Sequence, residues 1–283
     1  MVASQVSRSD IVEAITRTAR SFTPAAADTI LCENLYKHAY EVDAAQRAAG
    51  REGVVCDLGG GVGVNLLVLR RLGHRGRLVL IDSFDEYDET NRMGSWHSVL
   101  ATLRDHDVDV VRQNFWARPA LPLEDGSVDV TTCFDVVEHL PGHPLRQLRE
   151  LYRVLRPGGR CITSGPNGVS LIKRLRTITG RYPYAPFEAW LSDAFYGHYR
   201  EYAPAEYEEL LRRAGFADVD SHASAAVTLC RARQGYHRRR LTALSPLRVA
   251  LWGVAAVEVA LPGLRHTIYA WGTKPPDTKP PQH

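Results

Sequence analysis

The glycines at positions 59, 61 and 63 constrain the fold more than any other feature of this sequence. They follow VVCDL (54–58), a short apolar run typical of a buried parallel strand, and they precede VNLLVLRRLG (64–73), which has the length of a helix. Glycine accepts positive φ angles and lets the backbone come close to a neighbouring group. The pattern therefore predicts a strand that turns sharply into a helix.

Strand-like and helix-like segments alternate through the middle of the chain. After the glycines, further strands are expected at 77–82, 108–115, 128–134 and 159–165, with helix-length stretches between them. Two late strands are expected at 217–227 and 265–274. This order predicts an α/β fold, with a Rossmann-like, doubly wound, mostly parallel sheet of seven strands.

The segments around this alternation are expected to add covers and inserts. Residues 1–50 read as an N-terminal helical cover, in which Asp10 caps a first helix and a second helix runs unbroken from Pro24 to Gly50. The main domain is expected at 51–272, followed by a disordered proline-rich tail at 273–283.

Two inserts interrupt the main domain. A lid insert is expected at 166–203, because eight of the 24 aromatic side chains lie from Tyr182 to Tyr202; a satellite core under a long loop is the alternative. A helical, partly basic insert is expected at 228–264. Its segment 231–261 suits packing on the domain or in a homodimer, and alternatively peripheral contact with an anionic membrane.

Composition excludes several classes of protein. With 45% hydrophobic and 24% charged residues, the chain is typical of a soluble globular protein, and a net charge of +3 gives no case for a nucleic-acid partner. The five cysteines form no CxxC pair, which favours reduced thiols over disulfides or zinc. The N-terminus lacks the apolar core of a secretory signal, so a cytoplasmic location is expected.

Acidic residues flank the glycines and limit the choice of ligand. Asp57 precedes the turn and Asp82 closes the next strand, where a carboxylate can accept hydrogen bonds from a ribose diol. A carboxylate beneath the turn would repel a pyrophosphate but suits a cation. A phosphate-binding loop requires Gly-Lys-Ser/Thr after its glycines, and this sequence has none there. A dinucleotide-binding fingerprint would need a glycine at the position of Val64. A cationic nucleoside is favoured, with an NAD-dependent reductase and a non-catalytic binding module as alternatives.

This set resembles the class I S-adenosylmethionine-dependent methyltransferases, whose D/E-x-G-x-G-x-G pattern is filled by Asp57, Gly59, Gly61 and Gly63. The segments LPLEDGSVDVTTCFDVVEHL and LYRVLRPGGRCITSGPN resemble those around the family's fourth and fifth strands. The resemblance implies S-adenosyl-L-methionine as the cofactor. The residues it implies for binding are Asp57, Gly59, Gly60, Gly61 and Gly63 for the methionine part, Asp82 and Ser83 for the ribose, Asn114 and Phe115 for the adenine, and Cys133 on the fourth strand. Asn114 departs from the acid usual in the family.

Two histidines are candidates for a general base. His139 follows the fourth strand, on the edge of the sheet where ligands bind. His198 lies in GHYREY (197–202), which resembles a segment of methyltransferases from polysaccharide and glycosylated-metabolite pathways. The predicted acceptor is a small molecule or a lipid-linked compound, methylated at a sugar or other hydroxyl.

The string DVVEH (135–139) also raises the question of a metal. Asp135, Glu138 and His139 could bind a divalent cation, as a similar string does in some quinone-pathway relatives. Aspartate in the first position shortens the reach, and helix starts favour acids for electrostatic reasons alone. No metal is therefore expected.

Overall fold

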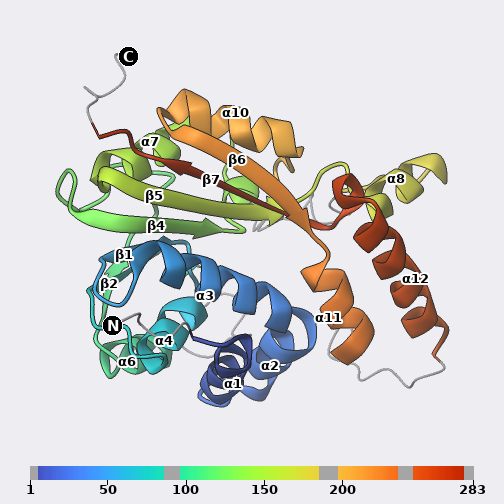
Figure 1. Cartoon of the computed structure of the whole chain (residues 1–283), viewed down its shortest axis with the longest axis horizontal. Helices are drawn as coiled ribbons and strands as arrows, with labels where there is room; N and C mark the ends of the chain where they lie inside the picture. Colours follow the sequence, from blue (N-terminus) through green and yellow to red (C-terminus); the bar gives the residue numbers. More distant parts are fainter. Residues whose placement is uncertain (1–5, 86–95, 185–196, 235–244, 277–283) are drawn as a thin grey trace.

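The computed structural model describes residues 6–85, 96–184, 197–234 and 245–276. Its centre is one seven-stranded sheet in the order β3-β2-β1-β4-β5-β7-β6 (Figure 1). The strands are β1 (Val55–Leu58), β2 (Leu78–Asp82), β3 (Val108–Arg112), β4 (Val128–Phe134), β5 (Leu155–Pro166), β6 (Ala217–Ser224) and β7 (Thr267–Thr273). The first five run parallel, and β7 is antiparallel to both β5 and β6. The predicted Rossmann-like sheet is confirmed.

Alternate residues of the central strands supply two apolar cores, one on each face of the sheet. On β2, Leu78 and Leu80 pack with the N-terminal helices, whereas Val79 and Ile81 pack toward the opposite face. All four are fully buried. Burial on both faces explains why these strands are almost wholly apolar in sequence.

Helices cover both faces (Figure 1). On one face, α1 (Arg8–Ala19) and α3 (Leu35–Ala49) pack together with α4 (Val64–Arg71). On the other, α7 (Leu145–Val154) packs with α10 (Pro204–Ala214). The edge strand β3 contacts α6 (Trp96–Arg104).

The N-terminal cover differs from prediction in two details. Ser7, not Asp10, is the N-cap of α1; Asp10 completes a capping box in which each side chain accepts a hydrogen bond from the other's backbone N–H. The helix predicted from Pro24 to Gly50 is divided into α2 (Pro24–Asp28), a π-helical turn (Thr29–Glu33) and α3. A repeating side-chain pattern cannot reveal such a change of backbone hydrogen bonding.

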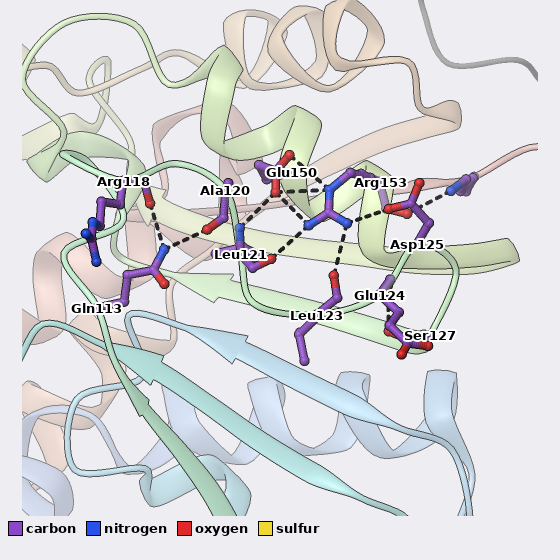
Figure 2. A network of polar contacts seen from close by, with 11 residues as sticks. Gln113, Arg118, Ala120, Leu121, Leu123, Glu124, Asp125, Ser127, Glu150 and Arg153 are labelled. Carbon is purple, nitrogen blue, oxygen red and sulfur yellow. Dashed lines mark hydrogen bonds and ion pairs between the residues drawn. The ribbon is translucent and has the colours of Figure 1, made fainter.

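Strand β3 ends at Arg112, so the strand predicted to reach 115 is three residues too long. The following segment is instead held against α7 (Figure 2). Arg153 donates to the carbonyls of Leu121 and Leu123 at 2.9 and 3.0 Å, and Glu150 accepts from the Leu121 N–H at 2.9 Å. These bonds fix the loop that follows Asn114 and Phe115.

The C-terminal elements close the sheet and extend beyond it. Helix α11 (Ala226–Gln234) packs on α3 and leads toward α12 (Pro246–Ala260), which contacts α11 and α8 (Leu171–Ile178). The strand predicted to reach 227 ends at Ser224, because α11 begins two residues later. Of the predicted tail, Thr273 belongs to β7, and 277–283 lie outside the described residues.

Candidate active site

The glycine turn has the geometry that its sequence predicts. Gly59, Gly61 and Gly63 all have positive φ angles, of 71°, 57° and 71°. Gly63 is the N-cap of α4, and the Leu67 N–H donates to its carbonyl at 3.0 Å. A residue with a Cβ would be strained at each of these positions, so the direct passage from β1 into α4 requires glycine.

Asp57 lies directly beneath this turn. Its side chain is 2% exposed, and Oδ1 accepts a hydrogen bond from Thr132 Oγ1 at 2.6 Å. A Cβ added to Gly60 would collide with Asp57 Oδ2, so the second glycine is required by the buried carboxyl. Burial, with smaller contributions from Glu41 and Asp82, raises the pKa of Asp57 to about 7 despite the Thr132 hydrogen bond.

Asp82 joins the ends of β1 and β2. Its Oδ2 accepts from the Gly61 N–H at 2.9 Å, and its Oδ1 accepts from the Phe84 N–H at 2.8 Å. Each oxygen keeps a further lone pair, so these bonds leave acceptor capacity for a ligand hydroxyl. Ser83 follows, half-buried, and its Oγ accepts from the Asp85 N–H at 3.4 Å.

The two predicted adenine contacts lie at the end of β3. Phe115 is half-buried, and its ring lies 3.5 Å from the Cβ position of Gly59, against the turn. Asn114 is exposed, and its Oδ1 accepts from the N–H groups of Trp116 and Ala117 at 3.1 and 3.0 Å. The side-chain amide oxygen of Asn114 thus holds the loop in shape, while Phe115 offers an apolar face beside the glycine turn.

Cys133 is also close to the site but is directed into the core. It is 2% exposed and belongs to the apolar cluster on the α7 side of the sheet, and burial raises its pKa well above the usual value. Its thiol is therefore an apolar packing group within β4.

The structure brings the two candidate bases together across 59 residues of sequence (139 to 198). The ring centroids of His139 and His198 are 4.7 Å apart in an edge-to-face arrangement. The carbonyl of Glu138 accepts from the Tyr199 N–H at 2.7 Å, which fixes the segment carrying His198 against the 3-10 turn (Val137–His139) that follows β4. His198 Nδ1 lies 2.7 Å from Glu201 Oε1, so one ring nitrogen is oriented by a carboxylate.

Burial, followed by His139 and Lys173, lowers the pKa of His198 to about 4. A proton on His198 is therefore disfavoured, and its imidazole is neutral at neutral pH. Glu138 precedes His139 and is 1% exposed. Among the described residues neither of its carboxylate oxygens has a hydrogen-bond partner, and burial raises its pKa to about 7. Burial therefore favours the neutral forms of both His198 and Glu138.

Lys37 is a site residue that the sequence analysis did not select. From α3 it forms an ion pair with Asp135 at the end of β4, and its Nζ lies 3.7 Å from Glu41 Oε1. Burial raises the pKa of Glu41, but Lys37 and hydrogen bonds from His38 and Asn65 outweigh burial and bring it to about 2. In the sequence, the only sign of this ion pair was that Lys37 and Glu41 are four residues apart on a predicted helix, where oppositely charged side chains can pair.

Lys173 and Glu201 were also missed. They form a largely buried ion pair, and Glu201 follows His198 by three residues. The spacing in HYRE was the local signal for Glu201, whereas nothing in sequence connects Lys173 with it.

The residues able to hold a metal differ from those considered in sequence. Ligand atoms of Glu138, His139 and His198 lie within 4.8 Å of one another. Asp135 instead pairs with Lys37. Lys173, close enough to lower the pKa of Glu138, adds positive charge beside this cluster.

A cavity of about 320 Å³ opens beside His198. It is lined by aromatic and charged side chains from both ends of the 168–206 segment, among them Tyr182, Tyr184, Tyr199, Arg200, Glu201 and Glu206. The predicted lid residues Phe187, Trp190, Phe195 and Tyr196 lie outside the described residues.

Comparison with known proteins identifies the family. Residues 33–221, more than half of the chain, match the model of a methyltransferase domain. A Mycolicibacterium smegmatis protein named "Probable S-adenosylmethionine-dependent methyltransferase" is 34% identical over 181 residues, covering 62% of this chain and 56% of the relative. A protein of the same name from Mycobacterium tuberculosis H37Rv is 38% identical over 112 residues, covering 40% and 34%. The chain spans about half the length of the first of these relatives and about a third of the second.

Solved structures show the same fold. Phosphoethanolamine N-methyltransferase 2 of Haemonchus contortus, bound to S-adenosyl-L-methionine, matches with a TM-score of 0.52 and 15% identity, covering 83% of this chain and 52% of that one. A chain in the complex between the Haloferax volcanii Trm112 methyltransferase activator and its "putative methyltransferase" matches with a TM-score of 0.58 and 21% identity, covering 90% and 96%.

The mostly parallel sheet and the acidic glycine turn after β1 define a Rossmann-like α/β domain. The chain belongs to the class I S-adenosylmethionine-dependent methyltransferases. The residues present suit this cofactor, because Asp57 and Asp82 offer carboxyl groups to a cationic nucleoside and Phe115 offers a ring face beside the turn.

Proposed function

We propose that this protein methylates a hydroxyl group of a sugar or similar polyol, free or lipid-linked, using S-adenosyl-L-methionine. The observation that carries the proposal is the pairing of His139 with His198 beside a cavity lined by tyrosines and charged groups. Flat aromatic faces with polar edges suit the alternating apolar faces and hydroxyls of a sugar.

The cofactor supplies an electrophilic methyl group on a sulfonium. The chain's residues hold donor and acceptor in line and remove the hydroxyl proton as the oxygen–carbon bond forms and the carbon–sulfur bond breaks. His139 accepts that proton, since burial and the neighbouring His139 and Lys173 lower the pKa of His198 and disfavour a proton there. His198, oriented by Glu201, positions the His139 ring, and the proton then passes to solvent.

Acceptor recognition falls to the cavity. Tyr184 lies with its ring 5.4 Å from Lys173 Nζ, and its hydroxyl lies 3.5 Å from the Gly168 carbonyl. Arg200 pairs with Glu206 at 2.6 Å at the rim. In such a pair the guanidinium donates hydrogen bonds and the carboxylate accepts them. A ligand with several hydroxyl groups needs both, because each hydroxyl can donate and accept.

The proposal is tested by methyl transfer from labelled S-adenosyl-L-methionine to a panel of free sugars, glycolipids, phenols and amines. Transfer to a sugar hydroxyl supports it, whereas transfer only to amines contradicts the oxygen assignment. Calorimetry with NAD distinguishes a reductase, and cofactor binding without turnover on any acceptor indicates a non-catalytic module. For an accepted substrate, Tyr184→Ala is expected to raise its KM while the cofactor affinity stays unchanged.

A further inference from the structure

Helix α12 has its apolar and charged sides reversed relative to an ordinary surface helix. Its two charged residues face inward. Glu258 is fully buried, and Arg248 is half-buried and donates a hydrogen bond to the Arg233 carbonyl at 3.2 Å. The outward side carries apolar residues such as Val249 and Trp252, which are 59% and 45% exposed. A helix face of this kind normally contacts something other than water.

Helix α8 continues this surface. It contacts α12, and the two helices lie side by side beyond the end of the sheet (Figure 1). None of its residues is buried, and Ile178 is 81% exposed. Together the two helices and the residues beside them carry most of the exposed large apolar side chains in the described part of the chain: Leu175, Ile178, Tyr182, Leu247, Val249, Trp252, Val257, Val259 and Leu261.

The exposed charged side chains on α8 and just after it are all arginines. Residues 151–187, which include α8, and 221–257, which include most of α12, contain no aspartate or glutamate. Arg174, Arg176 and Arg181 are exposed on α8 and just after it.

We infer that α8 and α12 form one lipid-facing surface that binds an anionic bilayer. Exposed apolar side chains would enter the boundary between headgroups and acyl chains, and the arginines would contact the anionic headgroups. Among the described residues no helix is long and apolar enough to cross a membrane, so contact is with one leaflet. A second copy of the chain is less suited to cover this surface, because a two-fold interface would place two identical basic faces against each other and they would repel.

The position of the cavity connects this surface with the proposed function. Tyr182 is 68% exposed beside α8 and also lines the cavity next to His198. A bilayer held against α8 would present the headgroup of a lipid-linked acceptor at that opening. This part of the inference rests on the proposed function, whereas bilayer binding does not.

Binding is tested by co-sedimentation of the full chain with vesicles of phosphatidylcholine alone and with 30% phosphatidylglycerol added, without cofactor or acceptor. The chain is expected to bind the anionic vesicles, with about tenfold weaker partitioning for Arg176→Glu and for Trp252→Glu. Arg104→Glu, on the exposed side of α6, is the matched control and is expected to bind as wild type. Raising the salt to 0.5 M should release the protein.

Insertion of α12 into the bilayer can be measured separately, through the tryptophan fluorescence of the wild-type chain. Lipids brominated near the headgroup are expected to quench tryptophan fluorescence, and Trp252→Phe should remove most of that quenching. Wild-type protein that stays in the supernatant at low salt overturns the inference. A chain that binds no vesicles and forms a dimer abolished by Val249→Glu identifies a second copy as the occupant. Vesicle binding without methyl transfer would leave the surface intact and contradict only the proposed function.

Discussion

The Gly61 N–H donates to Asp82 Oδ2 at 2.9 Å, so the turn after β1 and the end of β2 form one unit. The carboxylate proposed to bind ribose therefore also holds the glycine turn in place. Cofactor affinity and local structure are consequently coupled at Asp82.

Asp82→Ala is expected to weaken S-adenosyl-L-methionine binding by about 1.5–3 kcal/mol, the scale of hydrogen bonds lost to a charged group. Calorimetry with the cofactor and with S-adenosylhomocysteine measures this change. Asp85→Ala, three residues further on and half-buried, is the control and should bind normally. A folded Asp82→Ala variant with wild-type affinity would remove Asp82 from the site.

Gly60→Ala should lower both stability and cofactor affinity, because the new methyl group collides with Asp57 Oδ2 and approaches Leu80. The expected cost in unfolding free energy is about 1–3 kcal/mol, typical of overpacking in a core. Gly253→Ala, on α12 with open space around its Cβ position, should instead stabilise by about 0.5–1 kcal/mol. Equal effects of the two substitutions in thermal unfolding would contradict the close contact at Gly60.

His139→Ala is expected to lower kcat by about 10²–10⁴-fold, the range for a lost general base, with cofactor affinity unchanged. Exposed His143, four residues away, provides the control in His143→Ala. Glu201→Gln should give a smaller loss, since it weakens the orientation of His198 and the ion pair with Lys173 but removes neither imidazole. If His198→Ala causes the larger loss and His139→Ala does not, the roles are reversed. If chelators abolish turnover, a cation at Glu138, His139 and His198 replaces the metal-free mechanism.

Lys37→Met should destabilise the fold by about 3 kcal/mol, because it leaves the buried Glu41 and the partly buried Asp135 without their shared cation. Arg47→Met on the same helix breaks only an exposed pair with Asp43 and should change stability by less than about 0.5 kcal/mol. Urea unfolding at neutral pH compares the two. Similar values for both variants would mean that Lys37 is not a link between cover and sheet.

The acid dependence of stability provides an independent measurement on Glu41. Its pKa is lowered from the ordinary value to about 2, so its stabilising contribution is present above pH 4.5 and is lost as the pH falls toward 2. Lys37→Met removes a main cause of that lowered pKa. The difference in unfolding free energy between wild type and Lys37→Met should therefore shrink from pH 5 to pH 2.5, and a constant difference would contradict this assignment.

The sequence by itself determined the sheet, the glycine turn and the family, because each depends on local rules. Apolar runs identify strands buried on both faces, and glycine adopts without strain the positive φ angles found at 59, 61 and 63. Local rules fail where backbone hydrogen bonding changes within one residue pattern, as at the π-helical turn that divides the predicted helix from Pro24 to Gly50.

Only the tertiary structure decided which distant side chains meet. His139 and His198 were both selected from sequence, but their ring contact depends on the Tyr199 N–H bonding to the Glu138 carbonyl. Nor does any periodicity predict that Lys37 reaches Asp135, or that α12 turns its charged residues inward. These outcomes follow from how whole elements pack, since the direction of a side chain in space is set by the placement of its helix or strand and not by its neighbours in sequence.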